Sequence, residues 1–370
     1  MFSYRSKKQL YIAVVLTLLV FLIYYGFDIT MLSSPVGLYD AIALAAQSGA
    51  IGFQLIGILY LVSRLRRAFK DDLPPITCYR GSDCPYTAVK RVQYNGEYFA
   101  KFIAIFLSPF IIIEVVNLLI GNTNFRFQVF PLSPNDLFDI VNPVLYDVFN
   151  YGVTFTNYFL LGTISWILFS TVSAIRETKN VRYGMYDIVD VYCPDRVGGL
   201  SPIKKYLFSI LYVLLISVTL LMIGHTPLLT SFITHALGHG LYLPYFRVIA
   251  GFCVLSLYSL FGVALTIIGL RRLSSICLEK VEDGIKGINE KYRVLQKKLF
   301  ALSPDELDIP DREINNLKSI MEIFSNERER LLQWHSHCGG INAGTAIRLF
   351  VAYIPPLATI VFQLYQLFSL

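Results

Sequence analysis

Seven apolar stretches dominate this sequence, and each comes close to the length that a membrane-spanning helix requires. They are Leu10–Tyr25, Ala41–Val62, Phe99–Ile120, Gly152–Ile175, Leu207–Gly224, Phe246–Leu270 and Ala346–Phe368. A helix needs about 20 mostly apolar residues to cross the hydrocarbon core of a bilayer. We therefore predict an all-α membrane protein whose core is a seven-helix transmembrane bundle.

The composition argues against the main alternatives to a membrane protein. The chain is 55% hydrophobic and only 16% charged, with a mean hydropathy of +0.54. Soluble domains carry about 25% charged residues, which is well above the fraction in this chain. Disordered chains have a low content of hydrophobic residues, unlike this chain. The first stretch follows Lys7 and Lys8 as a signal peptide would, but no small-residue cleavage site comes after it. We expect it to be a true span.

Basic residues predict the orientation of the spans. With the N-terminus in the cytoplasm and seven alternating spans, 30 of the 32 Lys and Arg residues fall on the cytoplasmic side, and only Arg126 and Arg247 fall outside. Basic flanks face the cytoplasm in membrane proteins. The C-terminus is then external, in a multi-pass protein of the cell (plasma) membrane. A six-span arrangement, in which Pro355 and Pro356 stop the last segment from crossing, remains an alternative.

The sequence divides into three parts. Residues 1–270 hold six spans with their loops, 271–344 form a cytoplasmic piece, and 345–370 form the seventh span. The cytoplasmic piece carries an apolar stripe with heptad-type spacing at Val281, Ile285, Ile288, Tyr292, Leu295 and Leu299. A second stripe follows at Ile314, Leu317, Met321 and Phe324. We predict an antiparallel helical hairpin that packs on itself, joins subunits or transmits force to the spans.

The last span carries a polar stripe next to two helix-breaking residues. Thr359, Gln363 and Gln366 recur at positions i, i+4 and i+7, so they share one face of a helix. Tyr353 and the pair Pro355 and Pro356 precede them, and the prolines free backbone carbonyls that need other partners. The pattern suits a pore lining with a gate or hinge at the prolines. Alternatively, the glutamines bond to neighbouring helices and hold the bundle together.

Glu114 is the one carboxylate well inside an apolar stretch, and Asn117 lies almost one turn further along the same helix face. Ionisable groups within the membrane are costly and often mark ion or proton pathways. Glu114 and Asn117 are therefore candidates for a cation path. The alternative is a carboxylate held by hydrogen bonds inside the bundle.

Small residues in the second predicted span suggest a close helix contact. Ala45 and Gly49 are four positions apart, which is the small-xxx-small spacing that lets two helices approach closely. We expect this part of the span to pack directly on a neighbour.

His235 and His239 are four positions apart, so a helix would point both at one metal ion. No nearby carboxylate offers a third ligand, and a pH-sensitive external pair is an alternative. The chain has no phosphate-binding loop, dinucleotide fingerprint or nucleophile elbow. We therefore expect no cofactor, and catalysis has no support. The net charge of +6 reflects the basic flanks of the spans rather than a nucleic-acid partner.

The segment from Pro194 to Leu200, Pro-Asp-Arg-Val-Gly-Gly-Leu, resembles a loop in a loose group of uncharacterised prokaryotic multi-pass membrane proteins. In that group a His usually precedes the Pro, whereas this chain has Cys193. The group implies no known activity. In physical terms, Asp195, Arg196, Gly198 and Gly199 form either a tight turn at the membrane surface or an interface loop whose backbone amides cradle an anion.

The overall plan is similar to that of the insect chemoreceptor-type channels, including the gustatory receptors. These have seven spans, an internal N-terminus and a long cytoplasmic stretch before the last span. Gustatory members end in a Thr-Tyr-(five apolar)-Gln-Phe pattern, in which Thr359 and Gln366 match and Ile360 and Leu367 differ. The similarity implies that the last span lines the pore of a tetramer.

Three functions follow as hypotheses. The first is a channel-like homo-oligomer that passes ions along the last span. The second is a non-conducting membrane sensor or scaffold that binds a cytosolic protein partner through the hairpin at 271–344. The third is a small-solute transporter. In all three the lipid bilayer is the chain's constant partner.

Overall fold

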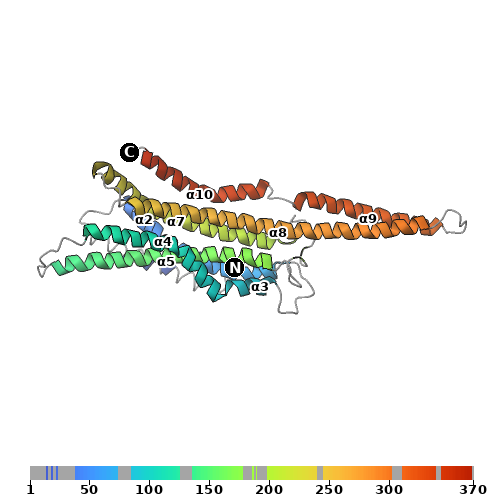
Figure 1. Ribbon diagram of the computed structural model, residues 1–370, viewed down its shortest axis with the longest axis horizontal. Coiled ribbons are helices and arrows are strands. Elements are labelled where there is room, and N and C mark those ends of the chain that lie inside the picture. Colours follow the sequence, from blue (N-terminus) through green and yellow to red (C-terminus); the bar gives the residue numbers. More distant parts are fainter. Residues whose placement is uncertain are drawn as a thin grey trace.

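Helices account for all regular structure in the part of the chain that the computed structural model describes. This part comprises residues 14–15, 18–19, 22–23, 38–73, 85–125, 136–177, 186, 189, 198–239, 245–301, 311–338 and 343–368. The helices are α2 (Leu38–Arg66), continued by the π-helical turn η1 (Arg67–Asp71), α3 (Pro85–Gln93), α4 (Gly96–Phe125), α5 (Asp136–Glu177), α7 (Ser201–His239), α8 (Tyr245–Ala301), α9 (Asp311–Cys338) and α10 (Ala343–Phe368). They form an elongated bundle with a two-helix arm at one end (Figure 1). The predicted all-α class is confirmed.

Six of these helices are long and apolar enough to cross a membrane, counting only the described residues. The candidate spans are Ala45–Asp71, Gly96–Val116, Tyr151–Glu177, Ser201–Gly224, Ala250–Phe300 and Gly344–Val361. They coincide with the second to seventh predicted stretches. Most of the first stretch, Leu10–Tyr25, lies outside the described residues. The fold is that of a helical multi-pass membrane protein, while the count of seven and the orientation stay predictions.

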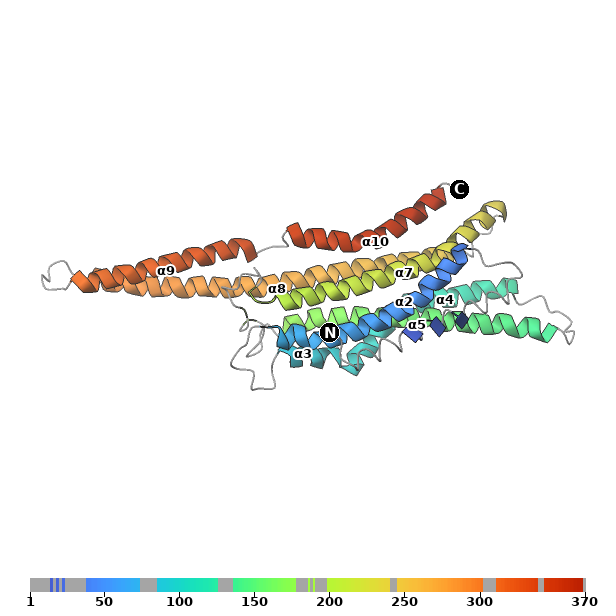
Figure 2. The same cartoon turned by 180° about the vertical axis from the view of Figure 1, so that it is seen from behind.

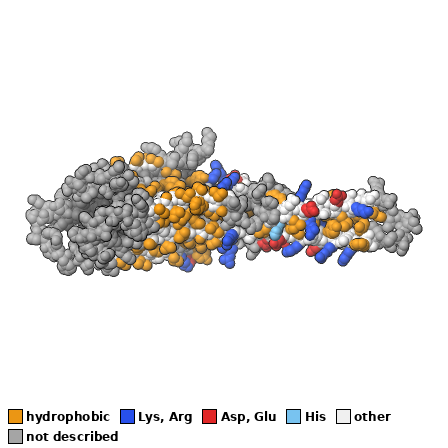
Figure 3. All heavy atoms as spheres, turned by 90° about the horizontal axis from the view of Figure 1, so that it is seen from above, with side chains coloured by type: hydrophobic (Ala, Val, Ile, Leu, Met, Phe, Trp, Pro, Cys, Tyr) orange, Lys and Arg blue, Asp and Glu red, His pale blue; other side chains and the backbone are white. Residues whose placement is uncertain are grey.

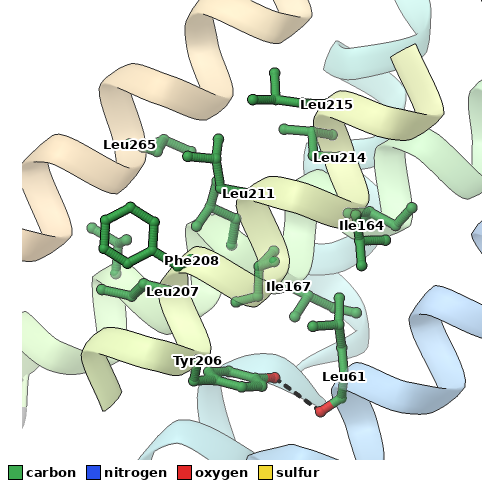
Figure 4. Packing of buried hydrophobic residues seen from close by; sticks show 14 of the residues in the cluster. Leu61, Ile164, Ile167, Tyr206, Leu207, Phe208, Leu211, Leu214, Leu215 and Leu265 are labelled. Carbon is green, nitrogen blue, oxygen red and sulfur yellow. Dashed lines mark hydrogen bonds between the residues drawn. The ribbon is translucent and has the colours of Figure 1, made fainter. Parts of the chain in front are cut away.

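Helix α7 occupies the centre of the bundle, where it packs against α2, α5, α8 and α10. It is apolar around almost its whole circumference, as a helix surrounded by others must be. Its side chains Leu207, Leu211 and Leu214 are fully buried. Figure 4 shows these leucines among side chains of α2, α5 and α8, with the Tyr206 hydroxyl donating a hydrogen bond to the Leu61 carbonyl at 3.2 Å. The neighbouring helices thus share one continuous apolar core.

Helices α2 and α7 lie in close contact at Gly57. A Cβ atom added there would overlap Cγ1 of Val213, whereas a Cβ atom at Gly49 would meet nothing within 4 Å. Among the described residues, the close contact expected at Ala45 and Gly49 therefore does not form at Gly49. Small-residue spacing marks positions where approach is possible, and the direction of the neighbouring helix decides which of them is used.

Helix α8 runs without a break for 57 residues, from the bundle into the arm. Helix α9 lies along its outer part (Figures 1 and 2). Val281 and Ile288 of α8 are buried against Leu331 of α9, and Ile285 and Phe324 pack beside them. In the face seen in Figure 3, apolar side chains cover the described part of the bundle, whereas Lys, Arg, Asp and Glu are spread along the arm. The arm is thus a two-helix hairpin whose helices pack together through apolar side chains. The division of the chain at residues 270 and 344 stays a prediction.

Substitution of Gly57 by Val should destabilise the bundle more than substitution of Gly49 by Val. Both changes place the same β-branched side chain in α2, but only the first forces the stiff Val213 side chain to move. Overpacking of a filled core costs about 1–3 kcal/mol. Unfolding of the purified variants in detergent measures the difference. Equal losses at the two positions would show that α2 and α7 do not approach at Gly57.

Candidate functional site

Helix α10 is the least covered of the six long apolar helices. Only 22% of its most apolar window is buried, compared with 33–78% in the other five. One face packs on the bundle, mainly against α7. The buried side chains of that face are Thr345, Leu349, Ala352 and Pro356. The opposite face is exposed and entirely apolar, and it consists of Ile347, Phe350, Val351, Ile354, Leu357 and Val361.

Pro355 and Pro356 lie inside α10 and interrupt its hydrogen bonding. Because neither has an N–H group, the carbonyls of Val351 and Ala352 lose their usual donors four residues later. The hydroxyl of Thr359 donates a hydrogen bond to the Pro355 carbonyl at 3.0 Å. The ribbon of α10 changes direction along its length (Figures 1 and 2). The middle of this helix is therefore a weak point that can act as a hinge.

The helical register decides which way the predicted polar stripe faces. Thr359 follows Pro356 by three positions, and positions 363 and 366 continue the spacing of four and three along α10. These positions extend the side of the helix that faces α7, not the exposed apolar side. The side chains of Gln363 and Gln366 lie outside the described residues. Tyr353 is partly buried and packs against the core.

Glu114 is buried on α4, with an exposed fraction of 9%. One turn earlier, Phe110 stacks on Tyr158 of α5 with ring centroids 4.5 Å apart. Helix α4 packs on α5 and α8, and α10 lies on the opposite side of the bundle (Figures 1 and 2). A single chain therefore does not bring Glu114 together with Thr359. The side chain of Asn117 lies outside the described residues.

Pro109 bends α4, and sequence reasoning overlooked its consequences. Pro109 has no N–H group for the carbonyl of Ile105, and the hydroxyl of Ser108 donates to that carbonyl at 2.7 Å instead. The next carbonyl, that of Phe106, accepts a hydrogen bond from the Tyr258 hydroxyl of α8. The rings of Phe106 and Tyr258 stack with centroids 4.0 Å apart. A proline within an apolar run is the signal that could have located this contact.

The glycine turn lies where α7 begins. Gly198 and Gly199 have φ angles of 62° and 80°, a region that glycine adopts without strain. A Cβ atom added to Gly198 would lie 3.3 Å from the sulfur of Cys277 and 2.6 Å from Cγ1 of Val189. The turn therefore packs directly on α8. Asp195 and Arg196 lie outside the described residues, so the anion-binding interpretation stays a prediction.

A second contact attaches the same segment to α8. The hydroxyl of Tyr186 donates a hydrogen bond to the carboxylate of Asp283, and the Lys280 ammonium lies 4.3 Å from the centre of the Tyr186 ring. Both partners belong to the part of α8 where the arm begins. Sequence reasoning missed this contact because Tyr186 and Asp283 are 97 positions apart.

A polar group of side chains joins three helices in the core. The amide of Gln47 on α2 donates to the Gly224 carbonyl of α7 at 3.0 Å, and Asn157 of α5 donates to the Gln47 carbonyl at 3.4 Å. Gln54 on α2 is fully buried, and its amide has no hydrogen-bond partner among the described residues. Gln47 and Gln54 are seven positions apart, which puts both on one helix face. This spacing was the signal in the sequence that could have indicated a polar contact.

His235 and His239 belong to α7, which extends to His239, but their side chains lie outside the described residues. Within the described residues, no group of three or more His, Cys, Asp or Glu side chains could hold a metal ion. The metal interpretation therefore stays a prediction.

Comparison of the chain with family models, with curated proteins and with solved structures finds no match. Function is therefore inferred from the geometry of the chain itself.

Replacement of Tyr258 by Phe should lower the free energy of unfolding by about 1–3 kcal/mol, because the Phe106 carbonyl loses a donor in a region without water. The ring and its stacking remain. Thermal unfolding in detergent is the measurement, and Tyr212→Phe on the exposed side of α7 is the control. If the two variants lose equal stability, the hydroxyl of Tyr258 does not support the bend of α4.

Proposed function

We propose that this chain is the subunit of a channel-like homo-oligomer in which ions pass along α10. The observation that carries the proposal is the combination found in this one helix: a bare apolar face, two adjacent prolines and a polar stripe beyond them. The other long apolar helices are more deeply packed.

The packing of the bundle argues against a path through a single chain. Leu61, Ile164 and Leu211 come from three different helices and are all fully buried. Side chains of this kind, at the packing density of protein interiors, leave no room for a row of water molecules. In the proposal, the path therefore runs at the edge of the bundle beside α10, and a second copy of the chain completes it.

The polar stripe and the prolines support a gate in this helix. Lipid tails cover an apolar helix face as readily as protein does, so the exposed face alone requires no partner. The stripe at Thr359, Gln363 and Gln366 shares the side of α10 that faces α7, which corresponds to a closed arrangement. Rotation of the outer half of α10 about Pro355 and Pro356 would turn this stripe toward the path. Glu114 lies on the far side of the bundle and has no part in this path.

One observation favours the second hypothesis, a non-conducting sensor or scaffold. Helix α8 is continuous from the bundle into the arm, and the segment that contains Tyr186 and Gly198 is packed on it where the arm begins. A cytosolic partner that moved the arm would therefore pull directly on the bundle. Such a connection needs no pore, as in a sensor.

Ion flux through the purified protein in liposomes tests the channel proposal. The double variant Gln363→Leu/Gln366→Leu should abolish flux without changing stability, because it removes the polar groups that replace water around an ion. Gln296→Leu, on the exposed surface of the arm, should conduct like the natural chain. Absence of flux from the natural chain over a series of pH values and membrane tensions would contradict the channel and support the sensor.

Oxidative cross-linking in membranes tests the oligomer. Ile354→Cys places a thiol on the exposed face of α10, where it should form a disulfide with a second copy. Ala352→Cys places a thiol on the buried face and should add no cross-link beyond that of the natural cysteines. Equal cross-linking by the two variants would show that this face of α10 does not meet another subunit.

A further inference from the structure

A pocket of about 290 Å³ lies beside the turn that joins α3 to α4. Its walls come from four helices and are almost wholly apolar. The lining residues are Ile58, Val62, Gln93, Tyr94, Asn95, Gly96, Phe99, Thr163, Trp166 and Ile167. Such a wall fits a hydrocarbon chain, and the side-chain amide of Gln93, which has no hydrogen-bond partner among the described residues, is its polar exception.

The pocket lies at the level where the spans end. The candidate span of α4 starts at Gly96, and the last turn of the neighbouring α2 carries Arg64 and Arg66. Between these ends, the indole N–H of Trp166 donates to the Gln93 carbonyl at 3.0 Å. Tryptophan is enriched at the boundary between membrane and water, because its ring is apolar and its N–H needs a polar partner. The pocket therefore opens near the headgroup region of the bilayer.

Two basic residues of α3 precede the lining residues Gln93 and Tyr94 in the chain. The ammonium of Lys90 lies 5.8 Å from the ring centre of Tyr94, which lines the pocket. Arg91 follows on the exposed side of the short helix α3. Within the described part of the chain, neither cation forms an ion pair. Two basic residues of α3 that form no ion pair with described residues, one of them near a lining ring of an apolar pocket, match an anionic headgroup on an acyl chain.

We propose that the pocket binds one anionic phospholipid of the leaflet that faces the basic flanks. An acyl chain enters between Val62, Phe99 and Trp166, and the headgroup phosphate lies beside Lys90 and Arg91. A free phosphate ion would leave the apolar wall exposed to water. A zwitterionic lipid would fill the wall but gain little from the two cations. The lipid would attach the turn between α3 and α4 to α2 and α5.

Fluorescence quenching can report this lipid directly. The chain has two tryptophans, and Trp334 belongs to the arm, so the variant Trp334→Phe leaves Trp166 as the single reporter. Phospholipids with brominated acyl chains quench tryptophan only at short range. The full-length protein is placed in nanodiscs with increasing fractions of brominated phosphatidylglycerol or brominated phosphatidylcholine. We expect half-maximal quenching at a several-fold lower fraction of phosphatidylglycerol.

Two variants, studied in the same Trp334→Phe background, separate a specific site from the general lipid boundary. Lys90→Gln/Arg91→Gln should abolish the several-fold preference, because both cations that favour the anionic headgroup are then absent. Thr163→Phe fills the pocket and should reduce quenching by phosphatidylglycerol. Its control is Thr156→Phe, two turns earlier on the same helix. The two positions are matched because both hold a threonine whose hydroxyl donates to the carbonyl four positions earlier. The distance is 2.9 Å from Thr163 to Phe159 and 2.7 Å from Thr156 to Gly152.

Two outcomes would overturn the proposal. One is equal quenching of Trp166 by the two lipids in the Trp334→Phe protein, which would mean that only the general lipid boundary reaches this residue. The other is identical quenching curves for Thr163→Phe and Thr156→Phe. The surface variant Lys90→Gln/Arg91→Gln leaves the core untouched, so it tests the proposal even where Thr163→Phe fails to fold.

Discussion

The hydrocarbon core of a membrane contains no water, so each backbone carbonyl there needs a donor from the protein itself. This constraint separates the two bent helices of the chain. At Pro109, the freed carbonyl of α4 accepts from Ser108, and the neighbouring carbonyl accepts from Tyr258 of α8, so the bend is fixed to a second helix. In α10, by contrast, the hydrogen bond at the prolines is internal to the helix, from the Thr359 hydroxyl to the Pro355 carbonyl. The first bend is fixed by a hydrogen bond to a second helix, whereas the second is supported within its own helix, as the proposed hinge requires.

The helical hairpin could be predicted from the sequence because its two helices are neighbours in the chain and each needs a partner for its apolar stripe. Val281, Ile285 and Ile288 of the first predicted stripe and Phe324 of the second therefore pack together, and Leu331, which was not predicted, joins them. Contacts between distant helices were not predictable in this way. Periodicity identifies a face, but it does not say toward which helix that face turns. For this reason the close approach occurs at Gly57 and not at Gly49.

The same limit applied to the candidate site. Spacing grouped Thr359, Gln363 and Gln366 on one face, but only tertiary packing shows that the earlier half of α10 turns Leu349 and Ala352 toward the bundle. The apolar surroundings of Glu114 in the sequence indicated a carboxylate that is costly to place in a membrane, and therefore a candidate functional residue. They gave no information about the distance of Glu114 from α10. A buried polar residue can be recognised from its sequence context, whereas its partners depend on tertiary structure.

The long helix α8 links the two ends of the molecule. Near one end its Tyr258 supports α4, and at the start of the arm its Cys277 and Asp283 contact the segment that leads into α7. Because α8 is unbroken between these contacts, a displacement of the arm reaches α4 and α7 together. The proposed lipid lies on the α4 side, between α2, α4 and α5, whereas the proposed ion path lies on the α10 side. A lipid that stiffened the α4 side would make α10 the helix that yields when the arm moves.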